Sequence, residues 1–170
     1  MERSQTPVMR LEPWSDADGP ALLERLNTPE MTAHLGGPET PEKLADRHRR
    51  YLELDGKGQM FRITLDGETA GSIGLWETTW QGEAVWETGW GVLPEFQGRG
   101  VAAEAARLIV AEARAAGRHA HLHAFPATGN GASNAVCRKA GFTLRGEAPV
   151  EYPKGSWHPC NDWRLALNGT

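Results

Sequence analysis

The sequence predicts a single α+β domain, residues 1–170, in which helices flank both faces of a mixed, mostly antiparallel central sheet. The chain has 170 residues, of which 39% are hydrophobic and 24% charged, the size and composition of one globular domain. Two extended segments are joined by Asp66-Gly67, a strong local signal for an antiparallel hairpin. A segment with helical spacing separates two later extended runs, and such a crossover makes the runs parallel or nearly parallel neighbours.

The first third of the chain carries one strand and three signals for the start of a helix. Residues 8–14 form a short strand, and the sequence Ser-Asp-Ala-Asp at residues 15–18 is typical of a helix N-cap with an acidic residue three positions on. Thr28-Pro29 and Thr40-Pro41 each place a capping threonine before a proline at the first helical position. The glycines and proline at residues 36–38 keep the second helix short, whereas an apolar stripe carries the third to about Asp55-Gly56.

The rest of the chain alternates strands with two helices. Strands are expected at residues 60–65, 69–76 and 84–93, in an antiparallel meander with a looser connection at residues 78–83. A helix at residues 101–116 ends at Gly117, and a strand follows at residues 119–125. A helix at residues 130–140 ends at Gly141, a strand begins at residues 142–145, and residues 163–167 close the sheet.

Composition excludes several classes of protein. The formal net charge of −4 argues against a nucleic-acid-binding protein, which usually presents a basic face. The two cysteines, Cys137 and Cys160, supply neither a disulfide framework nor a metal quartet. Residues 1–9 lack the apolar core of a signal peptide, and no run approaches the length of a membrane span. A cytoplasmic protein that binds neither nucleic acid nor membrane is expected.

A glycine-rich turn precedes the helix at residues 101–116. No Ser, Thr, Asp or Asn stands where that helix begins, so its first N–H groups lack a side-chain acceptor. Gly98 and Gly100 have no Cβ to hold a ligand away, and a helix N-terminus attracts anions such as a pyrophosphate. A glycine cap that binds nothing is the alternative. The turn matches neither the dinucleotide fingerprint nor a P-loop.

Glu87 is the candidate general base. Alternation along the strand places it on one face with Gly89 and Gly91, where missing side chains leave space. The opposite face carries Trp86, Thr88, Trp90 and Val92. A solvated strand glutamate without a catalytic role is the alternative interpretation.

Two motifs resemble the GNAT superfamily of acetyl-CoA-dependent N-acetyltransferases. The first is Gln97-Gly98-Arg99-Gly100-Val101-Ala102, which matches the signature Gln/Arg-x-x-Gly-x-Gly/Ala. The second is residues 130–142, an Asn-x-x-Ser sequence followed by an amphipathic helix and Gly-Phe. From residue 28 onward the chain is similar to the ribosomal-protein N-terminal acetyltransferases of this superfamily. The resemblance implies the GNAT fold, acetyl-CoA as cosubstrate and no metal.

The resemblance also implies where coenzyme A lies. Its phosphates would meet the glycine-rich turn, where Arg99 is the favoured cation, and Arg138 or Lys139 on the later helix is a second candidate. The pantetheine arm would pair with main-chain groups of the strand that precedes the turn. The implied cofactor-binding residues are Trp90, Val92, Gln97, Gly98, Arg99, Gly100, Val101, Ala102, Asn130 and Arg138.

The same resemblance implies the catalytic groups. Glu87 would take the proton of the acceptor amine, usually through water, and it lies roughly 16 Å along the strand from Val92. Ser133 would protonate the leaving thiolate, although a helix N-cap is an equal alternative for this serine. Other branches carry a tyrosine acid where this chain has Cys137, so Ser133, Cys137 or water must serve here. Cys137 is otherwise a small buried helix residue.

The acceptor is less defined than the donor. A peptide or protein N-terminus is the first choice and a small amine such as an aminoglycoside the second, chosen by loops at residues 31–38 and 147–160. A homodimer is left open, and a catalytically silent protein that senses acyl-CoA is the rival function. The His-x-His pattern at residues 119–123 is not favoured as a zinc site, because no third ligand stands nearby. Packing or an acceptor-pocket wall are the two roles open to Trp76, Trp80, Trp86 and Trp90.

Overall fold

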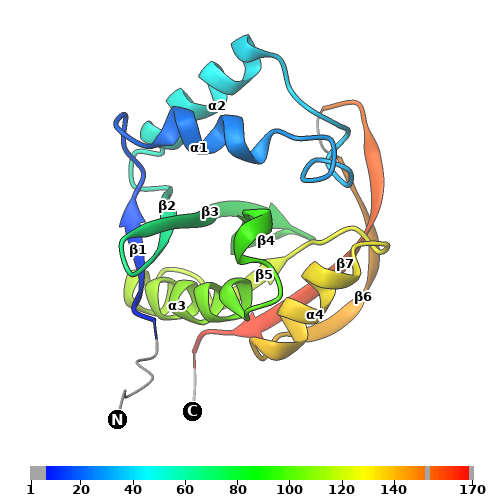
Figure 1. Ribbon diagram of the computed structural model, residues 1–170. Helices are drawn as coiled ribbons and strands as arrows, with labels where there is room; N and C mark the ends of the chain where they lie inside the picture. Colours follow the sequence, from blue (N-terminus) through cyan, green and yellow to red (C-terminus); the bar gives the residue numbers. More distant parts are fainter. Residues whose placement is uncertain (1–6, 152–153, 169–170) are drawn as a thin grey trace.

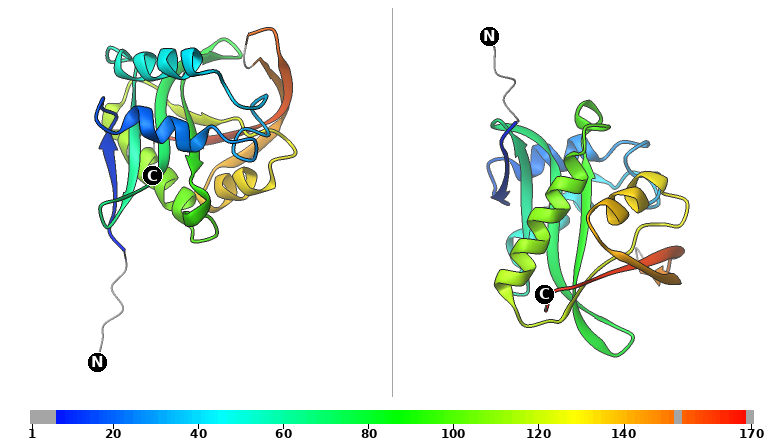
Figure 2. Two further views of the ribbon diagram at one scale, coloured as in Figure 1. Left: turned by 45° about the horizontal axis from the view of Figure 1, so that its top comes forward. Right: turned by 90° about the horizontal axis from the view of Figure 1, so that it is seen from below.

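The computed structural model describes residues 7–151 and 154–168 and confirms the predicted α+β fold. Within these residues seven strands form one sheet in the order β1-β2-β3-β4-β5-β7-β6, in which only the β4–β5 pair is parallel. Helices α1 and α2 cover one face of the sheet, and α3 and α4 cover the other (Figures 1 and 2). The strands are β1 Met9–Pro13, β2 Gly58–Leu65, β3 Glu68–Trp80, β4 Glu83–Val92, β5 His121–Ala124, β6 Thr143–Glu151 and β7 Trp157–Ala166. The helices are α1 Gly19–Leu26, α2 Pro41–Leu52, the 3₁₀ turn η1 Pro94–Phe96, α3 Val101–Ala116 and α4 Gly131–Lys139.

Helix α1 begins three residues later than the capping signal at residues 15–18 predicts. The acidic side chains of that signal bind elsewhere: Asp16 Oδ1 lies 2.7 Å from His48 Nε2, and Asp18 Oδ2 lies 3.4 Å from Arg62. Asp18 occupies the N-cap position without a side-chain cap hydrogen bond. Tertiary contacts therefore use the carboxylates, and the helix starts where Pro20 fits its first turn.

Residues 28–38 form turns rather than the short helix that Thr28-Pro29 predicts. The capping interaction itself is present, because Thr28 Oγ1 accepts a hydrogen bond from the Met31 N–H at 3.1 Å. One helical turn follows, with the Thr32 N–H bonded to the Thr28 carbonyl, and the chain then turns through Gly36 and Gly37, both at positive φ. By contrast, Thr40 caps the full helix α2 through the Lys43 N–H at 3.3 Å, as predicted.

The two hairpin turns of the meander each have two residues at positive φ. Asp66 and Gly67 have φ of 49° and 85°, which confirms the predicted hairpin. The loose connection expected at residues 78–83 is wrong: β3 continues to Trp80, and Gln81-Gly82, with φ of 50° and 79°, makes a second tight turn. The β3–β4 ladder is consequently longer than expected and keeps its register from Gly71↔Val92 to Trp80↔Glu83.

The C-terminal strands differ most from the prediction. Residues 147–160 were expected to be a loop, but β6 extends to Glu151 and β7 begins at Trp157. Strand β6 forms the edge of the sheet, and β7 lies between β5 and β6. Strand β5 is shorter than the expected residues 119–125. An antiparallel hairpin therefore stands beside the turn at residues 28–38 (Figure 1).

The sheet separates two apolar cores. The larger core lies under α3 and α4 and includes Trp86, Ile109, Cys137 and Trp163, while the smaller lies under α1 and α2 and includes Trp14, Leu22, Met60 and Leu93. Val92, the last residue of β4, and Leu93, which follows it, enter opposite cores, and this confirms the alternation that puts Glu87 on the α1–α2 side. Within the described residues no helix is long and apolar enough to cross a membrane.

Candidate active site

The glycine-rich turn has the main-chain conformation of an anion site. Gly98 and Gly100 have φ of 77° and 76°, a left-handed region in which other residues are strained. A Cβ at either glycine would meet no atom within 4 Å, so the space above the turn is open. The N–H groups of residues 98–103 form no hydrogen bond within the described part of the chain. These donors converge on the N-terminus of α3, where a phosphate would complete the cap.

Strand β4 offers a second row of main-chain groups next to this turn. Its pairing with β5 stops at Thr88↔Ala124, so residues 89–92 pair only with β3 among the described strands. The Leu93 N–H points to β3, where it bonds to the Ala70 carbonyl at 2.8 Å. By alternation, the N–H and C=O groups of Trp90 and Val92 point to the open side.

Gln97 joins the turn to this open edge. Its amide donates to the Val92 carbonyl at 2.9 Å, and it also approaches the Met31 sulfur at 3.4 Å. The Val92 carbonyl is therefore already bound, and the Trp90 groups and the Val92 N–H are left for a ligand.

The other predicted cofactor residues lie at the two ends of this surface. Arg99 is exposed, and its guanidinium carbon lies 5.5 Å from the centre of the Phe96 ring. Val101 is only 4% exposed and packs into the larger core, so only its main chain faces the turn, and Ala102 is partly buried beside it. Arg138 lies near the end of α4 over the Trp163 ring at 5.6 Å.

Glu87 lies on the other face of β4, with its carboxyl partly buried. Burial raises the pKa of this carboxyl to about 7, and a hydrogen bond from the Trp76 side chain opposes the shift. Trp76 is the register partner of Glu87 on β3, so the two side chains leave the sheet on the same face. At neutral pH the group is thus divided between its acid and base forms, as a general base requires.

The space expected beside Glu87 is filled, which corrects the sequence interpretation. A Cβ at Gly89 would lie 3.2 Å from the Trp76 ring, and a Cβ at Gly91 would lie 3.4 Å from Leu26. The glycines accept the indole and the end of α1 rather than leaving a gap. A tryptophan above Gly89 therefore walls one side of the carboxylate.

Asn130, not Ser133, caps helix α4, so the capping interpretation of Ser133 is wrong. Asn130 Oδ1 accepts a hydrogen bond from the Ser133 N–H at 3.2 Å. The Ser133 hydroxyl forms no hydrogen bond with the described residues and is partly exposed. Cys137 is fully buried in the larger core, and burial raises the pKa of its thiol to about 12, which makes it a weak acid.

Asn134 organises this corner of the site, although no sequence signal singled it out. Its amide donates to the carbonyls of Ala127 and Asn130 at 3.0 and 2.8 Å. Its Oδ1 accepts from Asn161 Nδ2 and Trp163 Nε1 at 2.7 and 2.8 Å. One buried side chain thereby ties the start of α4 to the preceding loop and to β7.

The three histidines of the His-x-His pattern each bind a different carboxylate. His119 lies 3.0 Å from Glu77, His121 lies 2.9 Å from Glu83, and His123 lies 2.6 Å from Asp162. Within the described residues no three His, Cys, Asp or Glu side chains gather as metal ligands. The His123–Asp162 pair is buried and lies on the face of Glu87, a feature that periodicity alone does not reveal.

A cavity of about 280 Å³ opens between the turn at residues 28–38, the loop before α4 and strand β7. It is lined by Ala33, His34, Gly36, Ala127, Thr128, Gly129, His158 and Pro159. Both segments expected to choose the acceptor, residues 31–38 and 147–160, contribute to it. His158 is held by Ser156 at 3.1 Å.

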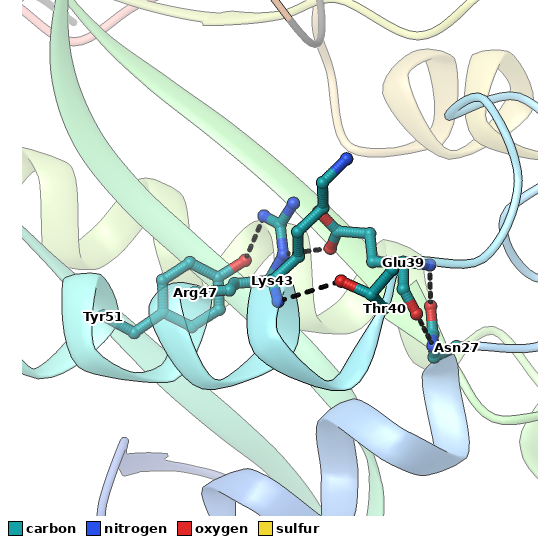
Figure 3. A network of polar contacts seen from close by, with 6 residues as sticks. All are labelled: Asn27, Glu39, Thr40, Lys43, Arg47 and Tyr51. Carbon is teal, nitrogen blue, oxygen red and sulfur yellow. Dashed lines mark hydrogen bonds and ion pairs between the residues drawn. The ribbon is translucent and has the colours of Figure 1, made fainter.

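The turn that forms one wall of this cavity is closed at its base by hydrogen bonds (Figure 3). Asn27 Nδ2 donates to the Glu39 carbonyl at 2.9 Å, and Asn27 Oδ1 accepts from the Glu39 N–H at 2.8 Å. The Glu39 carboxylate binds Arg47 of α2 at 2.7 Å, and the Arg47 guanidinium bonds to the Tyr51 hydroxyl at 3.2 Å. The guanidinium is the main reason that the pKa of Glu39 is lowered. Asn27 and Glu39 thus hold the two ends of residues 28–38 in fixed positions.

Comparison with known proteins supplies a family and a fold. The model of the acetyltransferase (GNAT) domain matches residues 9–143. No curated protein matches the sequence significantly.

Three of the similar solved structures cover almost the whole chain. An acetyltransferase from Salmonella typhimurium that modifies the N-terminal serine of ribosomal protein L7/L12 has a TM-score of 0.79 at 21% identity, over 94% of this chain and 95% of that chain. RimL, the ribosomal L7/L12 α-N-protein acetyltransferase, in complex with coenzyme A, has 0.77 at 20% identity, over 96% of each. An aminoglycoside acetyltransferase with coenzyme A and kanamycin has 0.75 at 19% identity, over 94% and 95%. At these identities the likeness establishes the fold.

Proposed function

Because this chain belongs to the GNAT family of acetyl-CoA-dependent acetyltransferases, we propose that it acetylates the free α-amino group of a peptide or protein, with Glu87 as general base. The observation that carries the proposal is the partly buried Glu87 carboxyl, whose pKa is raised to about 7 beside Trp76. It stands on the strand whose open edge leads from the glycine-rich turn. Donor and base are therefore arranged along one strand.

The pKa of Glu87 favours an α-amine over a lysine side chain. An α-amine has a pKa of about 8, close to that of the carboxyl, whereas a lysine has a pKa of about 10.4. Deprotonation of a lysine ammonium therefore costs about 3.3 kcal/mol more at a given pH. A base with a pKa near 7 is strong enough to deprotonate an α-ammonium but poorly matched to a lysine ammonium.

The residues of the turn and of β4 fit coenzyme A. The unpaired N–H groups of residues 98–103 and the exposed Arg99 would hold the phosphates, and the open edge at Trp90 and Val92 would pair with the pantetheine amides. Acetyl-CoA supplies the thioester that the amine attacks. The Ser133 hydroxyl, which has no partner in the described chain, is available to give a proton to the leaving sulfur.

Peptide and aminoglycoside acceptors are separated by one assay. Release of free thiol from acetyl-CoA is measured with peptides that begin with serine or alanine, with the same peptides blocked at the N-terminus, and with kanamycin. Turnover on the free peptides alone supports the proposal. Turnover on kanamycin alone supports the small-amine alternative, which the similarity in fold to the aminoglycoside enzyme favours.

Coenzyme A binding without turnover on any acceptor would contradict the proposed reaction. That result would favour a catalytically silent acyl-CoA sensor. Mass spectrometry of the peptide product, with fragmentation to place the acetyl group, checks that the α-nitrogen rather than a lysine side chain is modified.

A further inference from the structure

The pair His123–Asp162 has the arrangement of a histidine prepared to accept a proton. His123 Nδ1 lies 2.6 Å from Asp162 Oδ1, and the two side chains are 4% and 10% exposed. The second carboxylate oxygen, Oδ2, accepts a hydrogen bond from Trp80 Nε1 at 3.0 Å. A carboxylate can only accept, so Nδ1 carries the hydrogen and Nε2 presents a lone pair.

The His123 ring is held in place and its Nε2 atom is accessible. The ring stacks on Phe125 at 5.5 Å with an interplanar angle of 14°. Nε2 has no hydrogen-bond partner among the described residues, yet no fully buried side-chain nitrogen or oxygen there lacks one. Nε2 therefore reaches accessible space rather than the packed interior.

Position in the sheet places His123 beside Glu87. His123 is the register partner of Glu87 in the parallel β4–β5 pair, so both side chains leave on the same face from strands about 5 Å apart. The next pair, Thr88↔Ala124, is the last before the strands separate. The two groups consequently flank the start of the open edge of β4.

The reaction removes two protons from the acceptor nitrogen, so it can use two bases. An ammonium nitrogen carries three hydrogens and the amide product carries one, so two protons leave it while the N–C bond forms and the C–S bond breaks. One proton equivalent ends on the sulfur of coenzyme A and the other is released to solvent. A carboxylate takes only one proton at a time.

We propose that His123, oriented by Asp162, is a second general base that takes the proton released by the nitrogen once it is bonded to the acetyl carbon. Glu87 takes the first proton, from the ammonium. The nitrogen becomes more acidic once it is bonded to the acetyl carbon, so a weaker base suffices for the second step. Burial lowers the pKa of His123, although Asp162 opposes the shift, and this keeps the ring neutral before reaction. The inference rests on the proposed acetyltransferase function.

Two substitutions that keep the packing test the role. His123→Asn retains a donor to Asp162 but has no basic nitrogen, and Asp162→Asn favours the tautomer with hydrogen on Nε2. Each is expected to lower kcat for the free serine peptide by roughly a hundredfold, the lower end for proton-transfer groups, with an unchanged Kd for coenzyme A. His121→Asn, on the same face of the same strand, is the matched control and is expected to keep kcat.

The pH profile separates catalysis from a structural role. Below the pKa values of both bases the wild-type rate falls as pH decreases, with one proton for each base, whereas His123→Asn loses one proton from this limb. The titratable or charged groups around the two proposed bases, His123 and Glu87, are Glu83, His121, Cys160, Asp162 and Arg164. The His121→Asn control is expected to retain the wild-type number of protons.

The outcomes are distinct for this inference and for the function it rests on. If the wild-type chain acetylates none of the acceptors, both proposals fail. If it does so and His123→Asn keeps the wild-type kcat and pH profile, the second base is overturned while the function stands. NMR of isotope-labelled histidine in the unliganded protein gives an independent check: an Nε2–H tautomer at His123 would also overturn the role.

Discussion

The turn proposed to bind coenzyme A, residues 98–103 (the donor turn), and the face proposed to bind the amine (the acceptor face) are built on opposite principles. The donor turn uses main-chain N–H groups from one continuous segment, residues 98–103, and its glycines keep the space above it clear. The acceptor face uses side chains from separate strands: Trp76 and Trp80 on β3, Glu87 on β4, His123 on β5 and Asp162 on β7. A local sequence motif can specify the first. The second exists only when the sheet has assembled.

This difference predicts that substitutions divide into those that change cosubstrate affinity and those that change rate. Donor-turn variants should act on the Kd for coenzyme A, and acceptor-face variants on kcat. Residues that join the two regions should act on stability.

The largest effect is expected for Glu87→Gln. The variant keeps the hydrogen-bonding shape but loses the base, so kcat should fall by about 10²- to 10⁴-fold while the Kd for coenzyme A stays constant. The wild-type rate should fall as pH drops through about 7, the pKa of Glu87, and this dependence should disappear in the variant. An unaltered pH–rate profile would remove Glu87 from the role.

The same variant should be more stable than the wild type at high pH. The pKa of Glu87 is about 7 in the folded chain against an ordinary value of 4.5, so its contribution to stability is present below 4.5 and lost as pH rises through 7. In chemical denaturation, the free energy of unfolding of Glu87→Gln should exceed that of the wild type by up to about 3 kcal/mol above pH of about 8. Below pH of about 4 the two free energies should differ little. If the variant and the wild type have the same free energy of unfolding at both pH values, the Glu87 carboxyl is solvated.

Asn134→Ala should destabilise the fold by about 3 kcal/mol, because it removes four hydrogen bonds and leaves the buried Trp163 N–H without an acceptor. The carbonyls of Ala127 and Asn130 each keep a main-chain N–H partner. The midpoint of urea unfolding measures the loss. Asn161→Ala removes one of the same bonds from the network's edge and should cost about 1 kcal/mol. Similar losses in both variants would mean that the network is not centred on Asn134.

Gly100→Asp should weaken coenzyme A binding by about 10- to 100-fold, through a strained left-handed backbone and a carboxylate facing the phosphates. Calorimetric titration with coenzyme A gives the Kd. Gly82→Asp is the matched control, since Gly82 also has positive φ, at 79°, in the β3–β4 turn. Both variants should be similarly destabilised, and only the first should lose affinity. Affinity retained in Gly100→Asp would rule out the turn as the phosphate site.

The smallest effect is expected for Asn27→Ala, which removes both hydrogen bonds at the base of residues 28–38. The net loss of stability should be about 1–2 kcal/mol. The KM for the peptide should rise while the Kd for coenzyme A is unchanged. A change in coenzyme A affinity would instead couple this turn to the donor site.

Local signals predicted most of the fold. Thr40 before Pro41, the Asp66-Gly67 turn and the glycines after α3 and α4 each act within a few residues, and the structure confirms them. The β6–β7 hairpin was missed because its prolines argue against strands. Pro149 and Pro159 are register partners there: Pro149 lies on the edge strand β6, and Pro159 lies on β7 before its pairing with β5 begins.

The site divides in the same way. The open, glycine-rich form of the turn was predicted, and the structure confirms its glycine conformations and its lack of a side-chain cap. Its contacts with coenzyme A stay a prediction. The neighbours of Glu87 could not be predicted, because Trp76 and His123 reach it only through strand register. The sequence offered Ser133 as the cap of α4, but the helix begins earlier, so Asn130 Oδ1 meets the Ser133 N–H instead.

The two hydrogen bonds between the Asn27 side chain and the Glu39 main chain allow residues 28–38 to be exchanged as one segment. Both ends of the segment are fixed by one amide side chain, and Arg47 of α2 anchors the far end independently of the loop's own sequence. The cost of closing a longer loop grows only slowly with its length. Insertions or replacements within residues 28–38 would therefore reshape the wall of the 280 Å³ cavity without disturbing the sheet. Changes in this one segment could give the chain a new acceptor, in evolution or in the laboratory.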